Sequence, residues 1–156
     1  SLPIEYFTHL IAEEYVRYDR ELSLIMACHD EGSVCYDVCE NTHRRGILIK
    51  TMNKQHDPQA KLARGYLERI IDKLHYRGVL TVEFFQVGDR LVANEMAPRV
   101  HNSGHWTLDG CRTSQFENHL RAILNLPLGD PSSLSPTLMF NILSEMPDKR
   151  RLLSIK

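Results

Sequence analysis

The fold of this chain is decided by Leu80-Thr-Val-Glu-Phe-Phe85 and, shortly after it, Leu91-Val-Ala-Asn-Glu95. Both segments are mainly apolar, and each carries one glutamate, Glu83 in the first and Glu95 in the second. The intervening Gly88-Asp89 is typical of a tight turn, so the two segments predict a β-hairpin. A carboxylate in an apolar strand is costly unless a cation pairs with it. The pair of glutamates therefore suggests a metal site.

The length of the turn decides whether the two glutamates share a face, because side chains alternate along a strand. A two-residue turn at Gly88-Asp89 would place Glu83 opposite Asn94 and send Glu95 to the other face. An odd-length loop or a β-bulge would set Glu83 opposite Glu95. We predict such a loop or bulge, because facing carboxylates can share a divalent cation. The alternative, that both glutamates are solvated charges on an edge hairpin, stays open.

The hairpin is followed at once by Met96-Ala-Pro-Arg-Val-His-Asn-Ser-Gly-His-Trp106. This segment brings Arg99, His101, Asn102 and His105, which carry hydrogen-bond donors suited to oxyanions. Next to two carboxylates, they suggest a metal site that handles phosphate oxygens. The tryptophan that ends the segment is expected to pack beneath the loop.

The flanking sequence predicts further strands and two helices. Asp57-Pro58 is a helix start, and apolar residues at helical spacing follow it until Gly78. A second helix begins with the capping box Ser114-Gln-Phe-Glu117. Strands are expected at 11–16, 21–29, 33–41, 46–50 and 137–143, with a hairpin turn at 30–32. The order of elements predicts an α+β fold with a mainly antiparallel sheet and two or three helices.

The composition is that of one ordinary globular domain. The chain has 156 residues and a net charge of −1 from 19 basic and 20 acidic side chains. This balance gives no electrostatic support for binding to nucleic acid or to a membrane surface. No apolar stretch approaches the roughly 20 residues of a spanning helix. We therefore expect a cytoplasmic protein whose four scattered cysteines are reduced thiols rather than zinc ligands.

The residues quoted above resemble the N5-carboxyaminoimidazole ribonucleotide synthetases, a family of ATP-grasp ligases in purine biosynthesis. The string Ala97-Pro-Arg-Val-His-Asn-Ser-Gly-His-Trp106 is specific to that family among ATP-grasp enzymes. Upstream, Glu13-Glu-Tyr-Val16, Glu21 and the segment 40–48 also resemble it, and the match runs in order from residue 11 to about 126. One departure is Arg45, where the family usually has an acidic residue.

The resemblance implies roles for residues around a bound ATP. Glu13, Glu14, Tyr15 and Val16 match the hinge that lies along the adenine. Glu21 matches the carboxylate that accepts hydrogen bonds from the ribose hydroxyls.

Further residues match positions closer to the phosphates. His43 matches a residue near the nucleotide, and Asn94 lies beside the metal ligands. Glu83 and Glu95 match the ligands of magnesium, with two Mg²⁺ ions expected to bridge the ATP phosphates.

The resemblance also implies a reaction. Arg99, His101 and Asn102 match the group that holds bicarbonate and the developing carboxyphosphate. Collapse of carboxyphosphate to carbon dioxide would then allow capture by the amine of aminoimidazole ribonucleotide. The expected partners are thus ATP, bicarbonate and aminoimidazole ribonucleotide.

Members of this family are more than twice as long as this chain. The resemblance assigns residues 1–126 to the C-terminal lobe of the ATP-grasp fold. Residues 127–156 are expected to form a linker and the first strand of a truncated domain. A single lobe offers half of the contacts to ATP, so we expect the chain alone to be inactive and to self-associate, as a homodimer or otherwise. The alternatives are a non-catalytic nucleotide-binding module or one half of a split ligase.

Overall fold

The computed structural model describes residues 11–143, 148 and 150, and every structural statement here concerns those residues. They form a seven-stranded sheet in the order β6-β5-β1-β3-β4-β7, with β2 paired to β1, and every pairing is antiparallel. The elements in chain order are β1 Arg20–His29, β2 Gly32–Cys35, β3 Val38–Arg44, β4 Ile47–Lys54, α1 Ala60–Leu74, β5 Gly78–Val87, β6 Arg90–Ala97, the 3-10 helix η2 Asn102–Gly104, α2 Thr107–Gly110, α3 Gln115–Ile123 and β7 Leu138–Phe140. The α+β prediction is confirmed.

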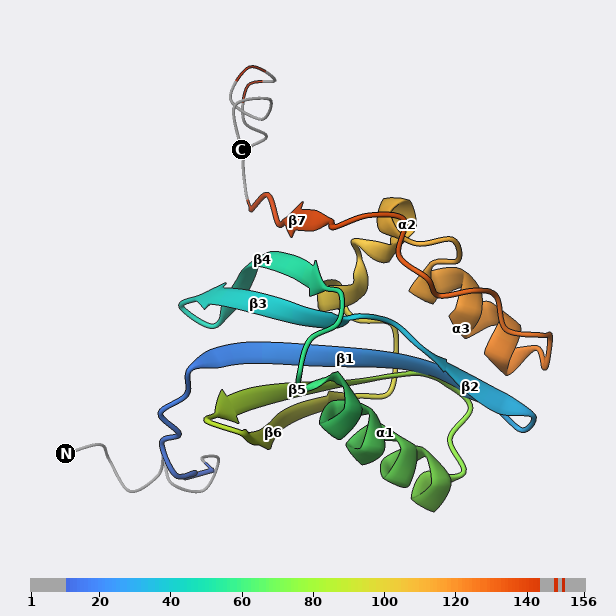
Figure 1. The fold of residues 1–156 in the computed structure, drawn as a ribbon, viewed down its shortest axis with the longest axis horizontal. Helices are drawn as coiled ribbons and strands as arrows, with labels where there is room; N and C mark the ends of the chain where they lie inside the picture. Colours follow the sequence, from blue (N-terminus) through green and yellow to red (C-terminus); the bar gives the residue numbers. More distant parts are fainter. Residues whose placement is uncertain (1–10, 144–147, 149, 151–156) are drawn as a thin grey trace, which may run out of the picture.

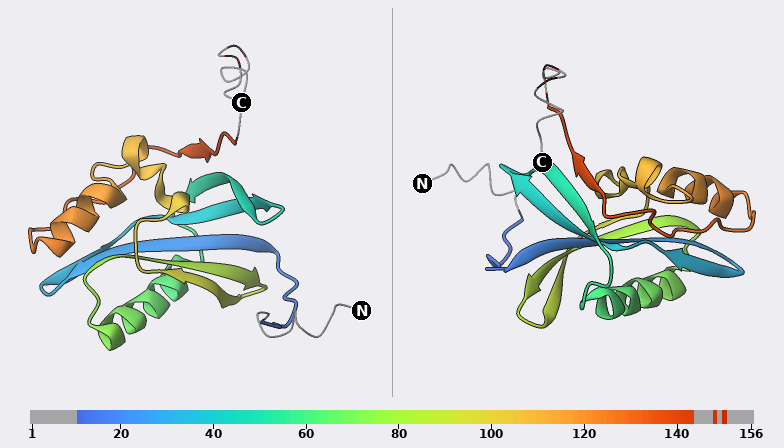
Figure 2. Two further views of the ribbon diagram at one scale, coloured as in Figure 1. Left: turned by 180° about the vertical axis from the view of Figure 1, so that it is seen from behind. Right: turned by 45° about the horizontal axis from the view of Figure 1, so that its top comes forward.

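The sheet separates two layers of helices (Figures 1 and 2). The helix α1 covers one face, while α2 and α3 lie over the other. The central strand β1 supplies both cores, because its side chains alternate between the faces. Leu22 and Leu24 pack with Leu67 of α1, whereas Ile25 packs with Trp106 on the opposite face. No described helix is long and apolar enough to cross a membrane.

The single tryptophan, Trp106, fixes the second core beneath α2. Its side chain is 3% exposed, and its Nε1–H donates to the Sγ of Cys39 in β3 at 3.0 Å. All four cysteines are free thiols, and burial raises the pKa of Cys39 to about 12. The expected structural role of the tryptophan and the reduced state of the cysteines are both confirmed.

The run predicted as one strand over 33–41 is two strands. The pairing Met26 with Cys35 changes to Ser23 with Cys39, so the returning chain advances four residues against three on β1. Tyr36 still donates its backbone N–H to the carbonyl of Ile25 at 3.0 Å, so the extra residue falls after it, before Cys39. The hydroxyl of Tyr36 donates to the carbonyl of Thr113 at 3.1 Å, a long-range contact that local sequence does not reveal.

The strand predicted at 11–16 is absent, which corrects the prediction. Residues 11–15 are exposed and have no regular secondary structure, and β1 begins only at Arg20. The neighbouring strand β5 ends at Val87. Its last backbone hydrogen bond with the segment before β1 is from the N–H of Asp19 to the carbonyl of Gln86, at 2.8 Å. The earlier residues therefore lie beyond the reach of a described pairing strand.

The helix α1 is shorter at both ends than predicted. Asp57 caps the preceding turn, with its Oδ1 accepting from the N–H of Gln59 at 2.9 Å, and the helix itself starts at Ala60. It ends at Leu74 because His75 takes the left-handed conformation with φ of 48°. His75 thus does what a glycine usually does at a helix end. Gly78, the predicted stop, is the first residue of β5.

The end of the described chain packs back onto the sheet. Ser114 caps α3 as predicted, its side chain accepting from the N–H of Glu117 at 3.2 Å. Asn118 then holds the returning segment by accepting from the N–H of Gly129 at 2.7 Å. The strand β7 confirms a strand within 137–143 and pairs with β4. The proposed domain division after residue 126 stays a prediction.

The core under α1 gives a stability test. Leu67 is 0% exposed, so Leu67→Ala leaves a cavity, and we expect a loss of about 2–5 kcal/mol in the free energy of unfolding. The matched control is Leu74→Ala in the same helix, where the side chain is 56% exposed, with an expected loss below about 1 kcal/mol. Denaturant unfolding measures both, and equal losses would contradict this packing.

Candidate functional site

A β-bulge in the β5–β6 hairpin sets the geometry of the candidate site. Val87 pairs with Arg90, so the turn has two residues, yet Glu83 pairs with Glu95 and Phe84 with Ala93. Asn94 is the extra residue that restores the facing pair of glutamates. The prediction of an odd-length loop or a bulge is confirmed in its second form.

The two glutamates line a pocket of about 390 Å³, called here the carboxylate pocket. Its three glutamates and its histidine come from four neighbouring strands: Glu95 from β6, Glu83 from β5, Glu21 from β1 and His43 from β3. The remaining lining residues are Tyr18, Arg45, Gly46, Phe85 and Asn94. Residues far apart in the sequence thus form one row across the sheet.

Glu21 is held in place on two sides. The hydroxyl of Tyr18 donates to its Oε1 at 2.5 Å, and Nδ1 of His43 contacts its Oε2. The hydrogen bond to Glu21 raises the pKa of Tyr18 above its usual value. Tyr18 also stacks on Phe85, with ring centroids 4.5 Å apart and planes 8° from parallel. The sequence did not single out this aromatic pair; the spacing of Tyr18 three residues before Glu21 was its only signal.

Glu83 lies in an environment that opposes its charge. Burial raises its pKa, and the nearby Glu95 and Glu21 raise it further, while His43 acts in the opposite direction. The Oε1 of Glu83 lies 3.8 Å from Nε2 of His101. An ionised carboxylate among other carboxylates is stabilised when a cation enters, so the donor set fits Mg²⁺.

The protein groups alone do not complete a metal shell. No cluster of three or more His, Cys, Asp or Glu side chains suited to a metal occurs among the described residues.

None of the three predicted residues of the segment after the hairpin lines the carboxylate pocket, but one of them, His101, lies next to Glu83. Burial, followed by Arg99, lowers the pKa of the His101 imidazole. Arg99 itself is exposed, and its Nη1 donates to the carbonyl of Val100 at 3.0 Å. The Oδ1 of Asn102 is buried and has no hydrogen-bond partner among the described residues, so it is an acceptor for a donor that enters.

The predicted hinge is not gathered with the other residues. Glu13, Glu14 and Tyr15 are exposed, Val16 is partly exposed, and none of the four lines the carboxylate pocket.

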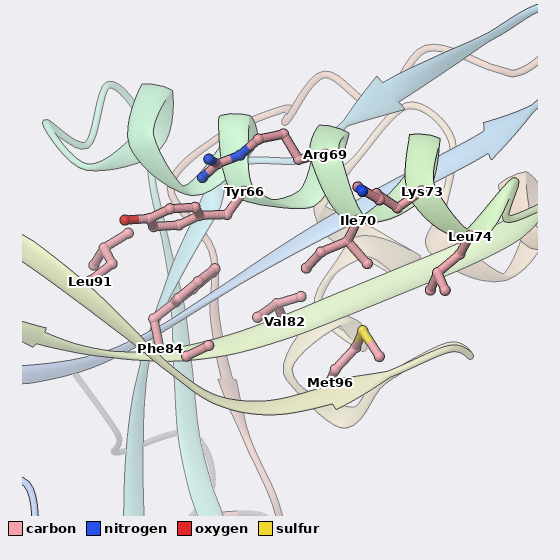
Figure 3. A pocket seen from close by; sticks show the side chains of 10 residues that line it. Tyr66, Arg69, Ile70, Lys73, Leu74, Val82, Phe84, Leu91 and Met96 are labelled. Atoms are coloured by element: carbon pink, nitrogen blue, oxygen red, sulfur yellow. The ribbon is translucent and has the colours of Figure 1, made fainter.

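A larger cavity of about 740 Å³ lies on the other side of the sheet, between α1 and the strands β5 and β6 (Figure 3). We call it the apolar groove; it is lined by Tyr66, Arg69, Ile70, Lys73, Leu74, Val82, Phe84, Leu91, Ala93 and Met96. Only Arg69 and Lys73 bring charge, and the Arg69 guanidinium lies 4.9 Å from the centroid of the Tyr66 ring. No carboxylate lines the groove.

The chain matches the ATP-grasp domain family over residues 3–116. The N5-carboxyaminoimidazole ribonucleotide synthase of Vibrio cholerae is 45% identical over 137 residues, covering 87% of this chain and 36% of that protein. The enzyme of the same name from Pseudomonas aeruginosa is 41% identical over 146 residues, covering 93% of this chain and 41% of that protein.

Solved structures agree with these sequence matches. The N5-carboxyaminoimidazole ribonucleotide synthetase of Thermus thermophilus superimposes with a TM-score of 0.84 at 44% identity, covering 91% of this chain and 41% of that one. The synthase of Aspergillus clavatus in complex with ADP and 5-aminoimidazole ribonucleotide gives a TM-score of 0.77 at 29% identity, covering 89% of this chain and 39% of that one.

The chain therefore spans between 36% and 41% of the length of these relatives, and within that span it shares the fold of the solved structures, as the resemblance predicted. The chain belongs to the ATP-grasp family.

Proposed function

We propose that this chain is the nucleotide- and metal-binding lobe of an ATP-dependent ligase that carboxylates aminoimidazole ribonucleotide with bicarbonate. The observation that carries the proposal is the row of Glu95, Glu83, Glu21 and His43 across four strands in one pocket. The names of the relatives support the reaction, and the Aspergillus complex with ADP and 5-aminoimidazole ribonucleotide supports the two organic substrates.

In this proposal the carboxylate pocket binds the ribose and the phosphates of ATP. Glu21, fixed by Tyr18 and His43, accepts hydrogen bonds from the ribose hydroxyls. Glu83 and Glu95 hold Mg²⁺, with two ions expected, and Asn94 lies beside them. Bound Mg²⁺ would neutralise charge on the phosphates during phosphoryl transfer. The hinge of Glu13, Glu14, Tyr15 and Val16 would lie along the adenine.

The oxyanion side of the reaction falls to the segment after the hairpin. Arg99 offers a planar fork for two-point contact with bicarbonate or carboxyphosphate. The free Oδ1 of Asn102 accepts a hydrogen bond, which suits the hydroxyl of bicarbonate. His101, in the same segment, has its Nε2 3.8 Å from Oε1 of Glu83. These residues thus bind and orient the anion, while Glu83 and Glu95 would hold the Mg²⁺ that neutralises charge on the transferred phosphoryl group.

The proposal includes a cytoplasmic location and self-association as a homodimer. The support for self-association is the set of exposed apolar side chains at the end of α3, namely Leu120, Ile123 and Leu124. Large exposed apolar patches mark contact surfaces.

Loss of the facing carboxylates tests the metal site. We expect Glu83→Gln and Glu95→Gln each to weaken Mg²⁺-dependent ATP binding by at least about tenfold, equivalent to about 1.4 kcal/mol. Titration calorimetry with Mg²⁺ and with a chelator measures this difference. The matched control is Asp89→Asn at the exposed turn of the same hairpin, which should bind as the parent chain does. Unchanged binding in both glutamate variants would remove the proposed metal site.

Turnover tests whether the lobe is half of a ligase. The 156 residues cover only 36–41% of the length of the relatives, and one lobe makes half of the contacts to ATP. We therefore expect no bicarbonate-dependent ADP release from the purified chain with aminoimidazole ribonucleotide. Adding the N-terminal part of a relative should restore it, and the Glu83→Gln chain should not. Full activity of the chain alone would contradict the split, while no activity in the mixture would favour a non-catalytic nucleotide-binding module.

A further inference from the structure

A continuous series of buried side-chain hydrogen bonds runs from β4 through β3 and β1 to the loop after β6. The hydroxyl of Thr51 donates to Oδ1 of Asn41 at 3.0 Å, and Nδ2 of Asn41 donates to Oγ of Ser23 at 3.0 Å. Ser23 then donates to Oγ of Ser103 at 2.9 Å. Thr51, Ser23 and Ser103 are 0% exposed and Asn41 is 6% exposed. Polar side chains are costly to bury unless they are hydrogen-bonded, and these four hydrogen-bond to one another in series.

The series of hydrogen bonds ends on one nitrogen of His101. The Oγ of Ser103 lies 2.9 Å from Nδ1 of the imidazole, and the backbone N–H of Ser103 donates to the same Nδ1 at 3.3 Å. A backbone N–H can only donate, so Nδ1 is an acceptor without a proton. In the neutral imidazole the proton is then on Nε2, the nitrogen 3.8 Å from Oε1 of Glu83.

The backbone around His101 is fixed separately. The side chain of Gln115, itself 0% exposed, accepts from the N–H of His101 at 3.1 Å and donates to its carbonyl at 2.6 Å. The backbone at Gly104 packs too closely for any side chain, because a Cβ there would lie 2.4 Å from Cδ1 of Ile25. With the backbone held in this way, the orientation and tautomer of the imidazole ring can still vary. The hydrogen bonds from Ser103 to Nδ1 fix both.

We propose that Ser103 and Ser23, supported by Asn41, are positioning residues that hold His101 as the Nε2–H tautomer with this N–H aimed at the carboxylate pocket. A neutral His101 fixed in this way cannot accept a proton from the pocket. Its Nε2–H, 3.8 Å from Oε1 of Glu83, is available to donate to an anion bound beside that carboxylate, so its role in the proposed ligase reaction is that of a hydrogen-bond donor. This role rests on the proposed function, whereas the tautomer does not.

The tautomer is measured directly by heteronuclear NMR on the purified chain with isotope-labelled histidine. At about pH 8, well above the ordinary histidine pKa of about 6.5, the ring is neutral and its two nitrogens report which one carries the proton. We expect Nε2–H as the main form in the parent chain. Nδ1–H as the main form would overturn the proposal, whatever the variants do.

The variants test the contribution of each hydroxyl. We expect Ser103→Ala to shift the tautomer ratio toward Nδ1–H by about fivefold, equivalent to about 1 kcal/mol for one neutral hydrogen bond. Ser23→Ala should shift it in the same direction by less, because Ser103 keeps its hydroxyl but loses its donor. Ser33→Ala, at an exposed position in β2, is the matched control and should leave the ratio unchanged.

A role limited to packing predicts a different result. It would lower the unfolding midpoint of Ser103→Ala and Ser23→Ala and leave the tautomer ratio of folded molecules as in the parent chain, which would refute the positioning role. If Ser23→Ala does not fold, Ser103→Ala still decides. The measurement needs no ATP, so a chain with the Nε2–H tautomer that fails to bind Mg²⁺ and ATP would refute the proposed function alone.

Discussion

The site depends on one additional residue in a β-strand. Side chains of β6 would alternate strictly without the bulge at Asn94. With it, the consecutive residues Asn94 and Glu95 both line the carboxylate pocket, and Ala93 and Met96, three apart, both line the apolar groove. The bulge therefore serves both faces at once. It keeps apolar side chains toward α1 while it sets Glu95 opposite Glu83.

The facing glutamates make the pocket electrostatically incomplete. Burial disfavours ionisation of Glu83, and the nearby carboxylates of Glu95 and Glu21 add to that effect. The surrounding structure resists any relaxation, because Tyr18 and His43 fix Glu21 and the buried serines fix the loop that carries His101. A preorganised group of negative charges favours a cation over a rearrangement, which connects the packing of the sheet to its proposed chemistry.

Local signals in the sequence were enough for the elements that are stabilised locally. The apolar spacing of α1, the Ser114 cap and the facing glutamates were all predicted, the last because an unpaired carboxylate in a strand is costly. The break after Tyr36 and the early helix end at His75 were not. A one-residue irregularity in a strand and a left-handed histidine have no distinctive pattern in the local sequence.

The candidate site shows the same division. Glu21, His43, Glu83 and Glu95 come together as the resemblance implied, because strand order brings their strands side by side. The buried hydrogen bonds behind His101 could not be anticipated. Serine, threonine and asparagine carry no periodic signal, and their partners lie on other strands.

The position of Trp106 makes the chain its own optical probe. It is the only tryptophan in the sequence, it is buried, and its indole donates to the thiol of Cys39 beneath the loop that carries His101. Intrinsic fluorescence excited at the indole band therefore comes from one known place. Any loosening of that loop from β3 would appear as a change in emission, without a label attached anywhere on the molecule.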